Sequence, residues 1–147
     1  MKRIIMFSMV LLVVLGLFTG CSVSKYNAKI YSNAKDLLLP SFWEENKANE
    51  SNTFVITDRE TFDSVFDKDK LDVDFDKQMV CLCIFSDTSP SSREYILDGI
   101  SVEDGKTTIY FKLSHSNKKD AVQPYKRCLA VIMDKTDTSE VEFVENW

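Results

Sequence analysis

Two short segments of the chain are apolar at almost every position, and they constrain its fold more than any other feature. They span residues 78–85 and 128–133. A strand with one face in water would alternate apolar and polar residues, so continuous apolar runs of this length indicate strands buried on both faces. The sequence therefore predicts a sheet that is covered on both sides.

A helix is expected directly after a short strand at 53–56. Thr57 and Glu60 have the spacing of a capping box, with Thr57 as the N-cap and Glu60 at the third helical position. The apolar residues that follow repeat at helical spacing, and the helix is expected to end by Asp69. These residues are Phe62, Val65 and Phe66.

A hairpin is expected in the second half of the chain. The apolar positions of a strand at 93–103 change parity at Gly99, as they would at a β-bulge. Asp104 and Gly105 then form a strong turn sequence, and apolar and polar residues alternate over 108–113.

A last strand is predicted around Val141 and Phe143. The order of elements favours an α+β domain with an antiparallel sheet of five or six strands and one early helix. A closed or half-closed barrel is the alternative. We expect a signal peptide at 1–20, a tether with a partly apolar segment at 21–52, and a single α+β domain at 53–147.

The first residues are typical of an export signal. Lys2 and Arg3 precede an apolar run at 4–18. As a helix this run would reach only ~22 Å, which is shorter than the ~30 Å hydrocarbon core of a bilayer. It is therefore interpreted as a signal and not as a stable membrane span.

Residues 17–21 read Leu-Phe-Thr-Gly-Cys, and this stretch resembles the lipobox of bacterial lipoproteins. In that family small residues precede an invariant cysteine, whose thiol receives diacylglycerol before the signal is cut. The resemblance implies that Cys21 is lipidated and holds the protein on the extracytoplasmic face of the cell membrane. The alternative is an ordinary secretory signal or an uncleaved anchor, in which Cys21 has no special role.

The segment after Cys21 has two parts of different character. Residues 22 to about 33 are polar and small, as suits a tether, and residues 44–52 are interpreted as a loop. Residues 37–43 are too apolar for a tether and must be covered, either by the domain itself or by a partner or the membrane surface. Phe42 and Trp43 are the candidates for a partner contact or for a lid on the core.

From about 54 to 144 the chain has, in order, a strand, a capped helix, residues 74–80, the strand containing Tyr95, a hairpin, Pro124-Tyr125, 131–135 and 141–143. This order resembles the C-terminal domain of PrcB-type lipoproteins and small uncharacterised lipoproteins of Gram-positive anaerobes. PrcB-type proteins are accessory subunits of a surface protease complex, so the resemblance implies an accessory role and supplies no catalytic residue.

Three cysteines follow Cys21. Cys81 and Cys83 lie two residues apart on one strand and are expected to share a face, while Cys128 lies on another buried strand. Buried free thiols are one interpretation, and a disulfide from Cys128 to either of the others is a second. A zinc site would need a fourth ligand, and His115, the only histidine, lies in a distant polar loop.

Charge and glycine content exclude several classes of function. Removal of Lys2 and Arg3 with the signal changes the net charge from −5 to −7, which opposes binding to nucleic acid. After Cys21 the only glycines are Gly99 and Gly105, so there is no glycine-rich phosphate loop. Residues 72–83 imitate the start of an EF-hand loop but lack its glycine and its final glutamate.

No metal, cofactor or catalytic group is therefore predicted. A membrane-anchored protein-interaction or accessory module, with a partner in the cell envelope, is the function that the sequence favours. A lipoprotein that binds a small ligand or a metal is the alternative, and an enzyme is the least favoured class because no catalytic constellation is present.

Overall fold

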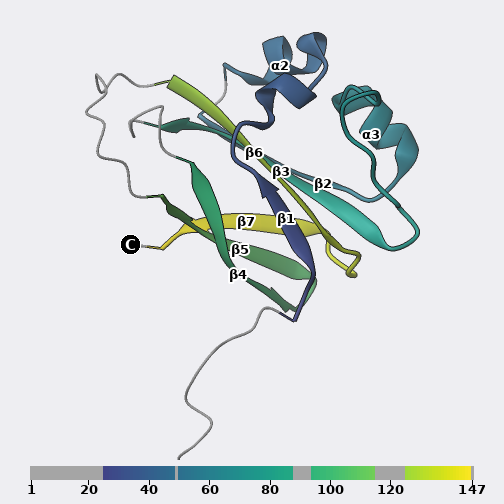
Figure 1. Ribbon diagram of the computed structural model, residues 1–147, viewed down its shortest axis with the longest axis vertical. Coiled ribbons are helices and arrows are strands. Elements are labelled where there is room, and N and C mark those ends of the chain that lie inside the picture. The colour runs from purple at the N-terminus through teal and green to yellow at the C-terminus, as the bar shows by residue number, and fades with distance from the viewer. Residues whose placement is uncertain (1–24, 49, 88–93, 115–124, 147) are drawn as a thin grey trace, which may run out of the picture.

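The structure is a computed structural model and describes residues 25–48, 50–87, 94–114 and 125–146. The elements follow one another as a strand, two short helices, a strand, a helix and five strands (Figure 1). Their bounds are β1 Ala28–Tyr31, the 3₁₀-helix η1 Ala34–Leu37, α2 Pro40–Asn46, β2 Ser51–Ile56, α3 Arg59–Val65, β3 Gln78–Asp87, β4 Tyr95–Glu103, β5 Lys106–Leu113, β6 Tyr125–Asp134 and β7 Glu140–Glu145.

The described strands form two sheets and not the single sheet that the sequence predicts. The larger sheet has the order β1-β6-β3-β2 and is antiparallel throughout, and the smaller has the order β4-β5-β7. In the smaller sheet β5 pairs with β4 antiparallel but with β7 parallel, so this sheet is mixed. The α+β class is confirmed, whereas a single antiparallel sheet of five or six strands and a closed barrel are wrong.

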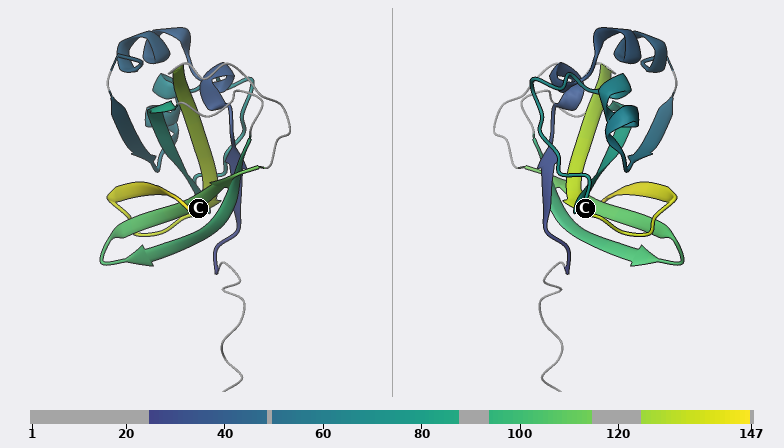
Figure 2. Two further views of the ribbon diagram at one scale, coloured as in Figure 1. Left: turned by 90° about the vertical axis from the view of Figure 1, so that its left-hand side faces the viewer. Right: turned by 90° about the vertical axis from the view of Figure 1, so that its right-hand side faces the viewer.

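The helices and the two sheets form three layers, which the side views in Figure 2 show one above another. One core lies between the helices and the larger sheet, and it contains Phe62, Leu82 and Ala130. A second core lies between the two sheets, and it contains Met133 and Ile109. The larger sheet is thus covered on both faces, which explains why β3 and β6 are apolar on both faces.

The predicted bulge and hairpin are confirmed. The register between β4 and β5 shifts between Leu97 and Gly99. At the turn Asp104 and Gly105 have positive φ angles of 50° and 77°, a conformation that glycine adopts without strain and aspartate tolerates.

The predicted helix is present as α3, but its N-cap is Asp58 and not Thr57. The Asp58 carboxylate accepts the Thr61 backbone N–H at 2.8 Å and the Thr61 hydroxyl at 3.0 Å. The helix also ends earlier than Asp69, because Phe66 is already extended and forms a bridge with Leu38. Phe62, Val65 and Phe66 are buried, as the spacing predicts.

The segment before β2 is more ordered than the sequence predicts. Part of the predicted tether forms β1, which pairs with β6. The predicted loop at 44–52 contains the end of α2 and the start of β2. The core does not stop at the expected boundary between 52 and 53, because Ala34 and Leu38 are also buried in it.

Candidate functional site

The apolar segment at 37–43 lies against α3 and lines a groove beside the helices. The backbone N–H of Leu39 donates to Val65 O at 2.9 Å, and that of Asp67 donates to Leu37 O at 2.9 Å. Pro40 occupies the first turn of α2, where its missing N–H costs nothing. These contacts fix α2 beside the end of α3, and the groove lies between η1, α2 and the segment after α3.

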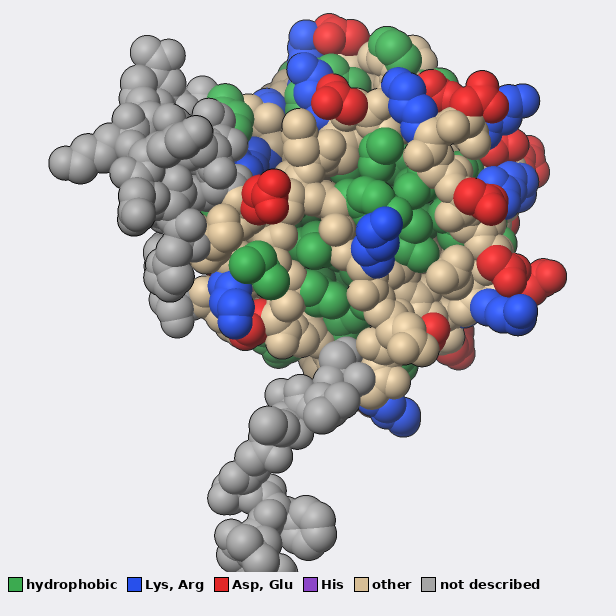
Figure 3. Space-filling view, in the orientation of Figure 1, with side chains coloured by type: hydrophobic (Ala, Val, Ile, Leu, Met, Phe, Trp, Pro, Cys, Tyr) green, Lys and Arg blue, Asp and Glu red, His purple; other side chains and the backbone are tan. Residues whose placement is uncertain are grey.

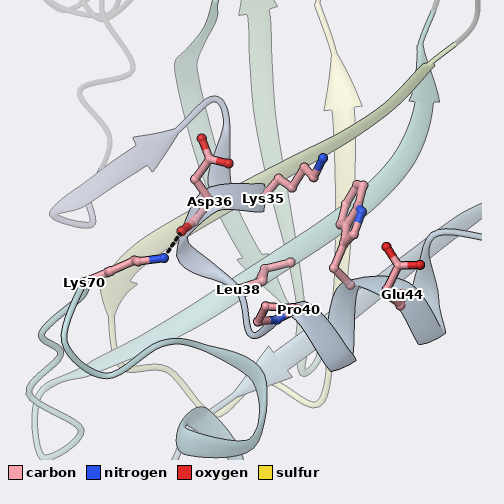
Figure 4. A pocket seen from close by; sticks show the side chains of 7 residues that line it. Lys35, Asp36, Leu38, Pro40, Glu44 and Lys70 are labelled. Carbon is pink, nitrogen blue, oxygen red and sulfur yellow. Dashed lines mark hydrogen bonds between the residues drawn. The ribbon is translucent and has the colours of Figure 1, made fainter.

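The groove has a volume of about 480 Å³ and combines an apolar floor with charged groups of both signs (Figure 4). Two lysines come from separate parts of the chain, Lys35 from η1 and Lys70 from the segment after α3. The full lining is Lys35, Asp36, Leu38, Pro40, Trp43, Glu44 and Lys70. Such a lining has no excess of either charge.

Local contacts hold the charged groups in place. The Lys35 ammonium lies 5.2 Å from the centroid of the Trp43 ring, within the range of a cation–π contact. The Lys70 ammonium donates to Asp36 O at 2.9 Å, and its nitrogen lies 3.3 Å from Asp67 Oδ2. Glu44 forms an ion pair with Lys47 one turn along α2.

The two predicted contact residues occupy different environments. Trp43 is only 8% exposed and belongs to the core, so it presents a small part of its ring to the groove. Phe42 is half-buried, does not line the groove and packs edge-on against Phe54 at 5.2 Å between ring centroids. The interpretation as a lid on the core therefore fits both residues, and only Trp43 reaches the groove.

A second, smaller hollow of about 350 Å³ lies beside β1, and its lining includes Lys29, Tyr31 and Ile132. The Lys29 ammonium lies 4.6 Å from the centroid of the Tyr31 ring. Figure 3 shows apolar side chains gathered in the middle of the face that β1 occupies, with one basic side chain lying among them and most of the other charged ones around the rim. The lining of this hollow has fewer charged residues than that of the groove, because Lys29 and Asp72 are the only charged ones among its described residues.

A buried ion pair joins β3 and β6, neighbouring strands of the larger sheet, at one of their ends, and Tyr95 of β4 connects it to the smaller sheet. Arg127 Nε lies 2.7 Å from Asp87 Oδ2, and the two side chains are 7% and 10% exposed. The Tyr95 hydroxyl donates to the same carboxylate oxygen at 2.5 Å, and the guanidinium lies over the Tyr95 ring. Burial raises the pKa of Glu145, and the charge of Asp87 raises it further. This cluster satisfies charges inside the protein, so it is a structural contact between the sheets.

The three described cysteines are free and buried. Cys81 faces the core between the sheets and Cys128 faces the core under the helices, so their sulfurs project from opposite faces of neighbouring strands. Cys83 lies on the same face as Cys81, as the spacing predicts, and cannot pair with Cys128 either. The predicted disulfide alternative is therefore wrong.

Burial also makes these thiols unreactive. It raises the pKa of Cys81 to about 12, and that of Cys83 to about 11 despite a hydrogen bond with Ser51 that lowers it. Burial raises the pKa of Cys128 as well. A thiol is a nucleophile or a metal ligand as its thiolate, so none of the three is suited to either role near neutral pH.

Other predicted features lie outside the described residues or carry no site. Cys21 and His115 belong to the parts that the structure does not describe. Among the described residues no group of histidine, cysteine, aspartate or glutamate side chains could hold a metal ion. The helices described here are also too short and too polar for any of them to cross a bilayer.

No protein-family model, curated protein or solved structure matches this chain. Sequence reasoning identified Trp43 but missed Lys35 and Lys70, which line the same groove although they lie far apart along the chain. Lys70 belongs to a run of alternating aspartate and lysine, and such a run is by itself typical of a solvated loop.

Proposed function

We propose that the protein is a lipid-anchored extracytoplasmic module that binds a protein partner in the groove between η1, α2 and the segment after α3. The observation that carries the anchoring is the order of a charged start, a short apolar run and Thr19-Gly20-Cys21. The resemblance to PrcB-type accessory lipoproteins supports a role in an assembly with other envelope proteins.

The lining of the groove favours a polypeptide over other ligands. A charged small molecule or a phosphate would be favoured by a single sign of charge, whereas Lys35 and Lys70 alternate here with Asp36 and Glu44. Protein interfaces combine an apolar centre, often with an aromatic ring, and a polar rim. The partly exposed ring of Trp43 and its charged surroundings have this arrangement.

Anchoring is tested by replacing the predicted lipid acceptor. The Cys21→Ser variant is expected to lose its acyl mass and to leave the membrane fraction or accumulate as unprocessed precursor. Intact mass spectrometry and fractionation of cells make both measurements. A wild-type protein without acyl mass, together with a Ser variant that is processed and retained normally, would refute the anchoring.

Partner binding is tested in two steps. Crosslinking in intact membranes and mass spectrometry identify the partner, and binding is then measured with both proteins purified. Lys35→Glu is expected to weaken binding roughly tenfold, which corresponds to about 1.4 kcal/mol of binding free energy. Loss of a hot-spot contact commonly costs this much or more. Lys77→Glu, which makes the same charge change on a residue outside the groove, is the matched control. Equal affinity of Lys35→Glu and wild type would refute the groove as the binding site.

A further inference from the structure

The chain enters the domain at a fixed point directly before β1. The Asn27 backbone N–H donates to Asp134 Oδ2 at 2.9 Å, and the Asn27 side-chain amide donates to the same oxygen at 3.2 Å. The backbone N–H of Asp134 returns a hydrogen bond to Asn27 O at 3.0 Å. Since β1 also pairs with β6, the chain is held against the larger sheet from Asn27 through β1.

Several turns surround this entry point. The backbone N–H of Lys135 donates to Lys77 O at 2.8 Å, and that of Ser139 donates to Gly105 O at 3.0 Å. We call the end of the domain formed by Asn27 and residues 74–77, 104–105 and 134–139 the entry end. Figure 1 and both views of Figure 2 show the start of β1 at the opposite end of the molecule from α2.

The tether between Cys21 and this point is short. Six residue steps separate Cys21 from Asn27, so the two can be at most ~21 Å apart, even with the chain fully extended. A compact domain of this size is about 35 Å across. To bring the groove to the lipid, the tether would have to run along the whole domain, and it is too short to do so.

The charges at the entry end also affect how the domain lies relative to the bilayer. Aspartates outnumber lysines there, so an anionic membrane surface repels this end instead of binding it. The aspartates are Asp74, Asp76, Asp104, Asp134 and Asp137, and the lysines are Lys77 and Lys135. The domain is therefore held close to the bilayer by its tether and not by adhesion of its entry end.

From these observations we propose that the domain stands with its entry end toward the bilayer and its groove facing away from it. The groove is then open to a protein partner on the extracytoplasmic side and out of reach of lipid. This inference rests on the proposed anchoring through Cys21, and it adds an orientation that anchoring alone does not imply.

The orientation is tested with the lipidated full chain in neutral phosphatidylcholine vesicles that carry an acceptor dye on their headgroups. A donor dye is attached to a new cysteine at Asp137, at the entry end, or at Glu45, on α2. Both positions are exposed, and both substitutions remove one negative charge. The parent protein measures background labelling, which is expected to be low because the described native thiols are buried.

Energy transfer to the membrane is expected to be at least about twofold higher from Asp137→Cys than from Glu45→Cys, because the two ends differ in height by about the width of the domain. Insertion of about 20 glycine and serine residues between Ser24 and Lys25 gives a tether of about 25 Å root-mean-square length and is expected to remove most of this difference.

Two results would overturn the inference in different ways. Equal transfer from the two positions, or higher transfer from Glu45→Cys, would refute the orientation while leaving the anchoring intact. A protein that fails to float with the vesicles would refute the anchoring itself, and the orientation with it.

Discussion

Truncation of Trp43 distinguishes a core residue from a surface contact. An aromatic side chain buries ~150–250 Å² on folding, which corresponds to ~4–6 kcal/mol at 25 cal/mol per Å². Trp43 is 8% exposed, so nearly all of this area is removed from water. A compact unfolded state reduces the gain by about 10–40%, which leaves ~2.5–5.5 kcal/mol, and the middle of this range, about 4 kcal/mol, is the expected cost of Trp43→Ala.

Urea unfolding followed by far-UV circular dichroism measures this cost. With a slope of about 1.5–2 kcal/mol per M, the midpoint is expected to fall by about 2 M. Phe42→Ala is expected to lose roughly half as much, since its ring is half-buried against Phe54. Ile96, which is 45% exposed, gives the control, and Ile96→Ala is expected to change the free energy of unfolding by no more than about 0.5 kcal/mol.

The result that would refute this reasoning is a Trp43→Ala variant as stable as Ile96→Ala. It would mean that the helical layer adds little to the stability of the core beneath it. Because Trp43 also reaches the groove, a loss of partner binding in Trp43→Ala cannot be interpreted without this measurement.

Three other predictions concern the ion pair, the helix cap and the thiols. Asp87→Asn leaves the Arg127 guanidinium buried without its carboxylate, so the free energy of unfolding should fall by about 3–5 kcal/mol; a change below about 1 kcal/mol would contradict the burial of the pair. The bonds from Thr61 lower the pKa of Asp58, so the cap stabilises the fold above the ordinary pKa of 3.8 and loses this effect as the pH falls through the lowered value. Asp58→Ala should therefore be less stable than wild type at pH 7 and match it under strongly acidic conditions, and an equal difference at both pH values in acid titrations would argue against the cap. The three buried thiols should react with an alkylating reagent only after denaturation, and rapid labelling of the native protein, seen by intact mass, would contradict their burial.

Local patterns predicted the parts of the fold that are locally determined. The doubly buried strands β3 and β6, the register shift before Gly99 and the turn at Asp104 all have signals within a few residues of sequence. The prediction of a single sheet was wrong for a different reason. Pairing patterns along the chain do not reveal that β7 joins β5 in parallel, because the crossover through β6 enters the other sheet.

The elements that were missed depend on distant partners. β1 has only four residues and one of them is Lys29, so its strand character comes from pairing with β6 about a hundred residues later. α2 presents polar residues to solvent, and these are also typical of a loop. Thr57 and Asp58 are both good caps, and the sequence alone does not decide between them.

The candidate site was predicted in part for the same reason. Trp43 could be predicted because it lies in an apolar segment beside a polar tether, and such a segment must be buried against the domain or a partner. Lys35 and Lys70 were not, since their relation to Trp43 arises only when the segment at 37–39 pairs with the end of α3. A groove that forms between elements distant in sequence leaves no recognisable pattern in the sequence of any one of those elements.

The pairing of β1 with β6 has a consequence for how the protein is made. The strand that follows the predicted anchor has its partner near the opposite end of the chain, with Asn27 and Asp134 separated by 107 positions. Synthesis proceeds from the N-terminus, so the larger sheet cannot be completed until almost the whole chain has been made. Folds dominated by such distant contacts also form slowly. For the extracytoplasmic location proposed above, β1 would therefore take its place in the larger sheet only after nearly the whole chain has crossed the membrane.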